Sequence, residues 1–123
     1  MAVARNISTV LYASAARTVS PTAVAQSNVS CRGVVVFIDV TAVTASPSVV
    51  FTIQGRGDDD EWYDILASAA VTATGNTVLR VYPGLTASAN AVANDVLPGT
   101  WRVSAVHGDA DSITYKVTAH TIV

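Results

Sequence analysis

The chain has 123 residues, of which 50% are hydrophobic and only 13% are charged, and its formal net charge is −2. This length predicts one domain with a core of its own, and the slight acidity argues against nucleic-acid binding, which requires clustered Lys and Arg. Cys31 is the only cysteine, so no intrachain disulfide forms, and no apolar run approaches the ~20 residues of a membrane helix. We therefore expect a domain that is made in a cytoplasm and binds neither nucleic acid nor a membrane.

The low proportion of charged residues also bears on the surface of the domain. Globular domains usually have about a quarter of their residues charged. A surface with few charges and many Ala, Ser and Thr residues is typical of a protein that packs against neighbours in an assembly. A small, neutral monomer is the alternative.

The N-terminal third predicts two strands and a crossing segment. Residues 3–12 alternate loosely between apolar and polar side chains, which indicates a first strand. We expect residues 13–32 to be an extended polar segment that crosses between sheets, with a short strand near residues 22–26.

Residues 33–56 contain the strongest strand patterns of the chain, in two runs joined by a polar link with a proline. Every second side chain of each run is apolar and shares one face: Val34, Val36, Ile38 and Val40 in the first run, and Val49, Phe51 and Ile53 in the second. Two such runs joined in this way predict a hairpin. The first run begins apolar on both faces, which indicates a strand in the middle of a packed sheet.

The rest of the chain predicts shorter strands that end at turn signals. We expect strands over residues 62–68 (continuing to 74), 77–82, 100–106 and 112–122, with a loop over 85–94. Seven to nine short strands with frequent turns predict an all-β fold, a single antiparallel β-sandwich of the jelly-roll or Greek-key type. We expect residues 1–123 to form this one domain.

Four consecutive acids, Asp58, Asp59, Asp60 and Glu61, fall on an expected turn. Clustered oxygen ligands bind Ca²⁺, so this run is a candidate metal site. A calcium loop spaces its ligands at alternate positions, however, whereas consecutive carboxylates on a turn point in different directions. We therefore favour a solvated tip, and we expect no metal or other cofactor.

His107, Asp109 and Asp111 occupy alternate positions, so an extended backbone would place them on one face. There they could hold a metal ion or orient a general base. Gly108 instead favours a tight turn that separates them, and the chain has no nucleophile-elbow pattern. We expect a protein that is not an enzyme.

Trp62, Tyr63 and Trp101 are candidates for an aromatic platform that binds sugars. In a sandwich with few other large side chains, aromatic residues more often belong to the core. The exposure of the three rings distinguishes these two interpretations.

Several longer stretches carry a resemblance to a known protein family, and together they span roughly residue 7 to the C-terminus. They are Leu11-Tyr-Ala-Ser-Ala-Ala-Arg17, residues 32–42 (RGVVVFIDVTA), 46–55 (SPSVVFTIQG), 77–86 (TVLRVYPGLT), 93–98 (ANDVLP), 100–103 (TWRV) and 109–115 (DADSITY). In these stretches the chain resembles a family of small virion structural proteins of tailed bacteriophages. It departs from that family between Arg56 and Trp62.

The resemblance implies a non-enzymatic virion protein, above all a capsid decoration protein that binds the lattice of the major capsid protein and stabilises it. Such a protein sits on the phage head exterior, acts through many repeated weak contacts, and is expected to be a homotrimer. Residues 1–17 would form a contact arm leading into the sandwich. The contact residues that we expect are Val3, Arg5, Ile7, Val10, Tyr12 and Arg17.

Two other functions stay open. A carbohydrate-binding or host-binding module of a tail or fibre would use Trp62, Tyr63 or Trp101. A tail-tube or connector component would form rings or stacked polymers instead of trimers.

Overall fold

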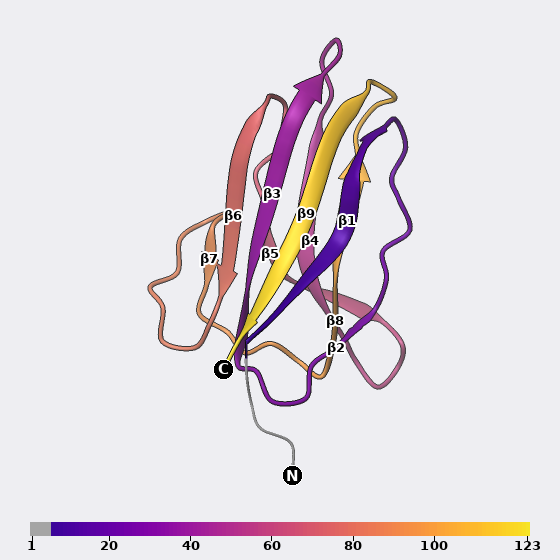
Figure 1. The fold of residues 1–123 in the computed structure, drawn as a ribbon. Helices are drawn as coiled ribbons and strands as arrows, with labels where there is room; N and C mark the ends of the chain where they lie inside the picture. The colour runs from indigo at the N-terminus through magenta and orange to yellow at the C-terminus, as the bar shows by residue number, and fades with distance from the viewer. Residues whose placement is uncertain (1–5) are drawn as a thin grey trace.

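A computed structural model describes residues 6–123, and in this range the chain forms nine strands and no helix. The strands are β1 (Ile7–Arg17), β2 (Gln26–Ser27), β3 (Gly33–Val43), β4 (Val49–Arg56), β5 (Trp62–Ala67), β6 (Gly75–Val81), β7 (Val92–Ala93), β8 (Thr100–His107) and β9 (Ile113–Ile122). They form two sheets that pack face to face (Figure 1). The prediction of an all-β sandwich is confirmed.

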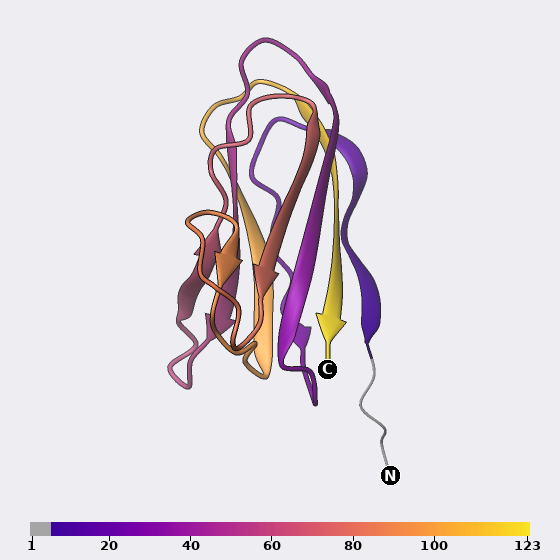
Figure 2. The ribbon, with the colours of Figure 1, turned by 90° about the vertical axis from the view of Figure 1, so that its left-hand side faces the viewer.

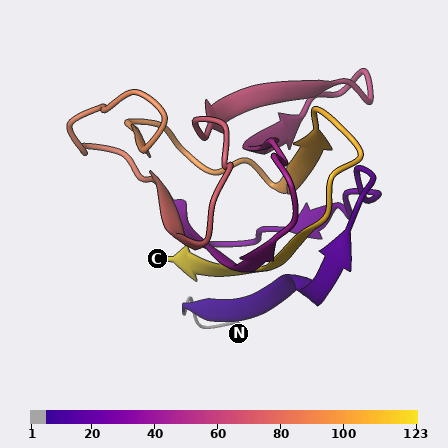
Figure 3. The same cartoon turned by 90° about the horizontal axis from the view of Figure 1, so that it is seen from above.

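The front sheet has the strand order β1-β9-β3-β6-β7, and the back sheet has the order β2-β8-β4-β5. All ladders are antiparallel except the short parallel pairing of β6 with β7. Figure 2 shows the two layers from the side, and Figure 3 shows them from above. As predicted, β3 lies in the middle of its sheet, between β9 and β6.

The predicted hairpin over residues 33–56 is wrong. Strand β3 belongs to the front sheet and β4 to the back sheet, so the link between them crosses the sandwich. Ala45 in this link has a φ of 59°, a left-handed backbone conformation. The physical reason is burial: in separate sheets the apolar faces of both strands point into the same interior, where water is excluded from both.

Several predicted boundaries also shift. Strand β1 runs on to Arg17 and the next strand is only Gln26–Ser27, so less of the chain crosses between sheets than expected. Residues 69–74 do not continue β5, and only Val71 pairs there, in a single bridge with Val49. Residues 85–94 are a loop as predicted, apart from β7 at its end.

Residues 7–17 are an edge strand of the sandwich, so this part of the expected contact arm does not stand apart from the domain. β1 pairs with β9 along its length, with register shifts between Val10 and Tyr12 and between Tyr12 and Ala15. Irregularities of this kind are common on edge strands, where they discourage pairing with other chains. Residues 1–5 of the expected arm lie outside the described residues.

The core lies between the sheets and is built from the inward-facing side chains of alternate residues. Its largest fully buried members are Trp101, Tyr115, Phe51, Ile38, Ile53, Leu79 and Ile113, surrounded by valines. The apolar faces that the sequence predicted for β3 and β4 are both part of this cluster. The core is therefore made mainly of β-branched residues, with a few aromatic rings that span from sheet to sheet.

Tyrosines connect the two sheets at one end of the core. The Tyr12 hydroxyl on β1 donates a hydrogen bond of 2.6 Å to the Val103 carbonyl on β8. The Tyr115 ring on β9 packs edge-on against Phe51 on β4, with centroids 5.1 Å apart. The Arg17 guanidinium carbon lies 4.6 Å from the centre of the Tyr115 ring and covers it. Packing between sheets here is thus combined with a directional hydrogen bond.

Tyr12→Phe should lower the free energy of unfolding by about 1–2 kcal/mol, because the buried Val103 carbonyl loses a donor. Urea denaturation followed by circular dichroism measures this change. The matched control is Tyr82→Phe, which removes an exposed hydrogen bond from the Tyr82 hydroxyl to the Val123 carbonyl. Equal losses in the two variants would contradict a structural role for the Tyr12 hydroxyl.

Stability should also fall at alkaline pH because of Tyr115. Burial raises the pKa of Tyr115 from 10.0 to about 12, so the folded protein keeps this phenol protonated over a range in which the unfolded chain ionises it. The unfolded state then binds fewer protons, and the free energy of unfolding decreases as pH rises from 10 to about 12. Tyr115→Phe should flatten this decrease in urea titrations at several pH values; an unchanged slope would refute the assignment.

Candidate functional site

The exposed part of β1 contains two of the residues predicted to contact a partner. Ile7 is 51% exposed and Val10 is 53% exposed. Both are apolar side chains that the fold leaves in solvent, so both are available for a contact. Val3 and Arg5, which were predicted with them, lie outside the described residues.

The other two predicted contact residues on β1, Tyr12 and Arg17, make contacts within the domain. Tyr12 is only 7% exposed and belongs to the core. Arg17 donates to the backbone carbonyls of Ala13 at 2.7 Å and Tyr115 at 3.0 Å, which fastens the end of β1. A partner could not reach Tyr12 without opening the sandwich.

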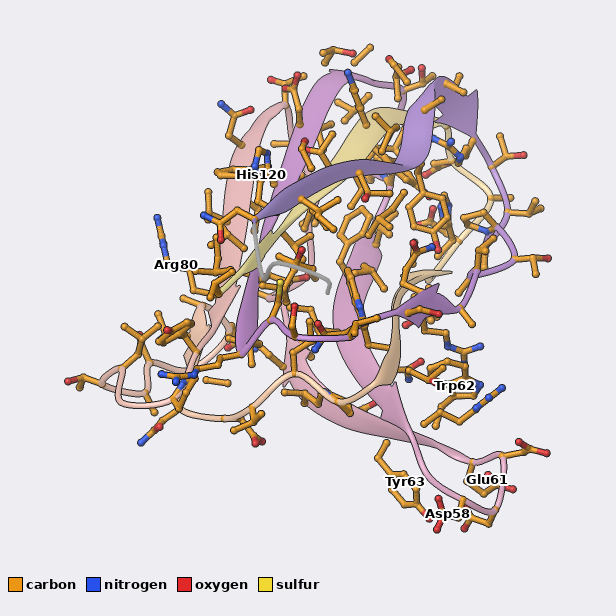
Figure 4. All side chains as sticks on the ribbon, turned by 60° about the horizontal axis from the view of Figure 1, so that its bottom comes forward. Asp58, Glu61, Trp62, Tyr63, Arg80 and His120 are labelled. Atoms are coloured by element: carbon orange, nitrogen blue, oxygen red, sulfur yellow. The ribbon has the colours of Figure 1, made fainter. Side chains whose placement is uncertain are left out.

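A row of side chains crosses the outer face of the front sheet, starting from Val10. Val10 pairs with Thr118 on β9, Thr118 pairs with Phe37 on β3, and Phe37 pairs with Val78 on β6. Phe37 is 40% exposed, and the edge of its ring meets the His120 ring with centroids 5.2 Å apart. We call Val10, Phe37, Val78 and Thr118 the outer patch; His120, which contacts Phe37, is labelled in Figure 4.

Charged side chains lie in the rows on either side of the outer patch. Asp39 and Lys116 pair in a row toward one end of the sheet, and Arg80 lies toward the other end. An apolar centre with a polar rim is the usual anatomy of a protein interface. Of these residues, Val10 is a contact residue that the sequence resemblance implies, whereas Phe37 and Val78 were not predicted from the sequence. The sequence did contain a signal for an exposed apolar patch: the first of the two runs in residues 33–56 begins apolar on both faces.

The acidic residues of the β4–β5 turn do not converge on one point. Asp59 accepts hydrogen bonds from the Glu61 backbone N–H at 3.1 Å and from the Tyr63 hydroxyl at 2.9 Å, and these two bonds lower the pKa of its carboxyl group. Asp58 and Glu61 are exposed. Within residues 6–123 no three His, Cys, Asp or Glu side chains are arranged to hold a metal ion. This turn is closed by its own hydrogen bonds.

The three aromatic residues proposed as a sugar platform lie in three different environments. Trp101 is 2% exposed and is part of the core. Trp62 is half-buried, with the Arg102 guanidinium 4.1 Å from its ring centre, while Tyr63 is 56% exposed. Neighbouring residues of a strand point to opposite faces, and Figure 4 shows the Tyr63 ring at the turn, away from Trp62. The three rings do not form a single platform.

Within residues 6–123, His107, Asp109 and Asp111 do not form a group that could hold a metal ion. The His107 Nε2 atom lies 3.0 Å from the Tyr115 hydroxyl, and burial lowers the pKa of His107. Asp109 accepts a hydrogen bond from the Asp111 N–H, and Asp111 accepts one from the Ser46 N–H. The two carboxylates therefore stabilise the loop.

Comparisons with other proteins add no further constraint. Among the described residues no helix is long and apolar enough to cross a membrane. No protein-family model, no curated protein and no solved structure matches the chain.

Proposed function

We propose that this chain is a non-enzymatic structural protein of a tailed-bacteriophage virion, and specifically a capsid decoration protein. In this role it docks on the outside of the phage head, binds the lattice of the major capsid protein and stabilises it. It acts as a homotrimer, so that each particle carries many copies of the same weak contact.

The outer patch is the observation that supports this proposal best. Val10 and Phe37 remain substantially exposed although the sandwich is otherwise complete around its core. Apolar side chains that gather on the outer face of a sheet and have a polar rim are typical of a surface that binds another protein. The sequence resemblance supplies the kind of partner, the capsid lattice.

Density for the protein should appear on the capsid exterior at threefold or quasi-threefold positions. Cryo-electron microscopy of particles that carry the protein, with head symmetry imposed, makes this measurement. The free protein should have three times the 12.7 kDa mass of one chain in light scattering. A bare capsid, with the protein present only in tail fractions, would contradict the decoration role.

Val10→Asp and Phe37→Asp should each weaken binding to capsids by about tenfold or more, because a carboxylate would be buried against an apolar partner without compensation. Co-sedimentation of purified protein with undecorated capsids measures this loss. The matched control is Val106→Asp, at a valine that is 57% exposed on the back sheet. Equal binding by all three variants would remove the outer patch from the capsid contact.

Substitutions of this kind are cleaner than removal of the N-terminal segment. A deletion of residues 1–12 would strip the first half of β1 from β9 and take Tyr12 out of the core. Loss of binding after that deletion could then result either from unfolding of the domain or from loss of the contact itself.

A carbohydrate-binding or host-binding module of a tail or fibre is the second candidate, and the exposed Tyr63 ring favours it. Of the two tryptophans, Trp101 is buried and gives this function no support. The location of the protein in the virion distinguishes the two candidates.

A further inference from the structure

A groove of about 270 Å³ lies at the end of the back sheet, between the β4–β5 turn and the segment that leads into β8. It is lined by Gly55, Arg56, Gly57, Tyr63, Ile65, Asp95, Val96 and Pro98. None of these residues belongs to the outer patch, which lies on the other sheet. The groove is therefore a second surface feature with its own chemistry.

Two of the lining side chains are apolar and unusually exposed. Tyr63 is 56% exposed and Val96 is 55% exposed, and both border the same groove. Leaving these two side chains in water is unfavourable in the isolated protein, and a ligand in the groove would cover both of them. The groove therefore has the apolar walls of a binding site.

The Tyr63 ring is held in place before any ligand arrives. Its hydroxyl donates a 2.9 Å hydrogen bond to the Asp59 carboxylate. On the other side the ring lies against the backbone at Gly57, where an added Cβ would come within 2.9 Å of Tyr63 Cε2. A larger residue at position 57 would require the Tyr63 or Asp59 side chain to move. Because the Tyr63 ring is already held in place while it remains exposed, it loses little conformational entropy when a ligand binds.

Acidic residues outnumber basic ones around the groove. Asp95 lines it, and Asp58, Asp59, Asp60 and Glu61 lie on the adjoining turn. Arg56 is the one base of the lining, and Arg102 lies nearby, against the Trp62 ring. The Arg56 guanidinium is directed toward Asp60, at 3.9 Å, and toward the Trp62 ring, at 5.9 Å. Within residues 6–123 this is the one ion pair. Arg56 offsets one of the five negative charges around the groove, so the surroundings remain acidic.

We infer that this groove docks a basic side chain, an arginine or a lysine, carried by an extended segment of a protein partner. The aliphatic stem of such a side chain would cover Val96 and Ile65, while its cationic head would lie over Tyr63 and near Asp95. Charge complementarity selects this occupant over a neutral sugar, which would gain nothing from the surrounding carboxylates.

The inference goes beyond the capsid role and does not depend on it. In a decoration protein the groove would add a charged contact to the apolar one at the outer patch. In a protein with another location it would bind a basic segment all the same. The two ideas therefore fail in different experiments, one with particles and one with peptides.

Nuclear magnetic resonance titration of the full chain with acetyl-Ala-Arg-Ala-amide tests the inference. The backbone amides of Gly57, Tyr63, Ile65 and Val96 should shift. The same peptide with citrulline, the uncharged isostere of arginine, should bind about fivefold more weakly, and salt at about 1 M should suppress the arginine effect. Equal binding of both peptides, or shifts confined to other parts of the molecule, would overturn the inference.

Variants of groove residues test whether the arginine peptide binds in the groove. Tyr63→Ala and Asp95→Asn should each weaken the arginine peptide about threefold to fivefold. Asn at position 95 can still accept the 2.8 Å hydrogen bond from the Val96 N–H, so this variant should stay folded, and its spectrum verifies that. The control, Asp39→Asn, removes one charge from the front sheet and should change nothing. Unchanged affinity in both groove variants, or shifts at the groove with methyl glucoside that match those with the arginine peptide, would refute it.

Discussion

Each of the two sheets has one apolar face, and the need to bury both faces against each other is the constraint on which the rest of the structure depends. Phe51 of the back sheet and Tyr115 of the front sheet meet edge to face at 5.1 Å in this interior. The Tyr12 hydroxyl adds a hydrogen bond from one sheet to the other. The chain satisfies this constraint by crossing between the sheets at every connection except β4–β5 and β6–β7.

The surfaces proposed for binding are what remains after the core is complete. The outer patch lies on the solvent side of β3, whose other side is fully buried, because alternate residues of a strand point to opposite faces. The groove lies where β4 and β5 extend beyond the core, and there Gly55 and Gly57 let Pro98 and Tyr63 approach the backbone. Both surfaces are apolar at the centre and charged around it, but the groove is much more acidic.

Residues of the same type have different roles in this protein, and the position of each residue in the fold determines its role. Tyr12 stabilises the core while Tyr63 is exposed on a turn, and Trp101 is buried while Trp62 lies beside Arg102. Arg17, which is predicted as a contact residue, also stabilises the end of β1 by a hydrogen bond to the Tyr115 carbonyl on β9. The register shifts in β1 contribute to this outcome, since they change which of its side chains face inward.

The sequence by itself determined the fold class, most of the strands and the inward faces of β3 and β4, because strict alternation of apolar residues is a local signal. It also indicated the exposed acidic turn. Only the tertiary structure decided that β3 and β4 lie in different sheets, that Tyr12 and Trp101 are buried, and that Phe37 lines up with Val10. These features depend on which strands become neighbours. Strand pairing is set by the joint burial of residues far apart in the chain, which no local pattern contains.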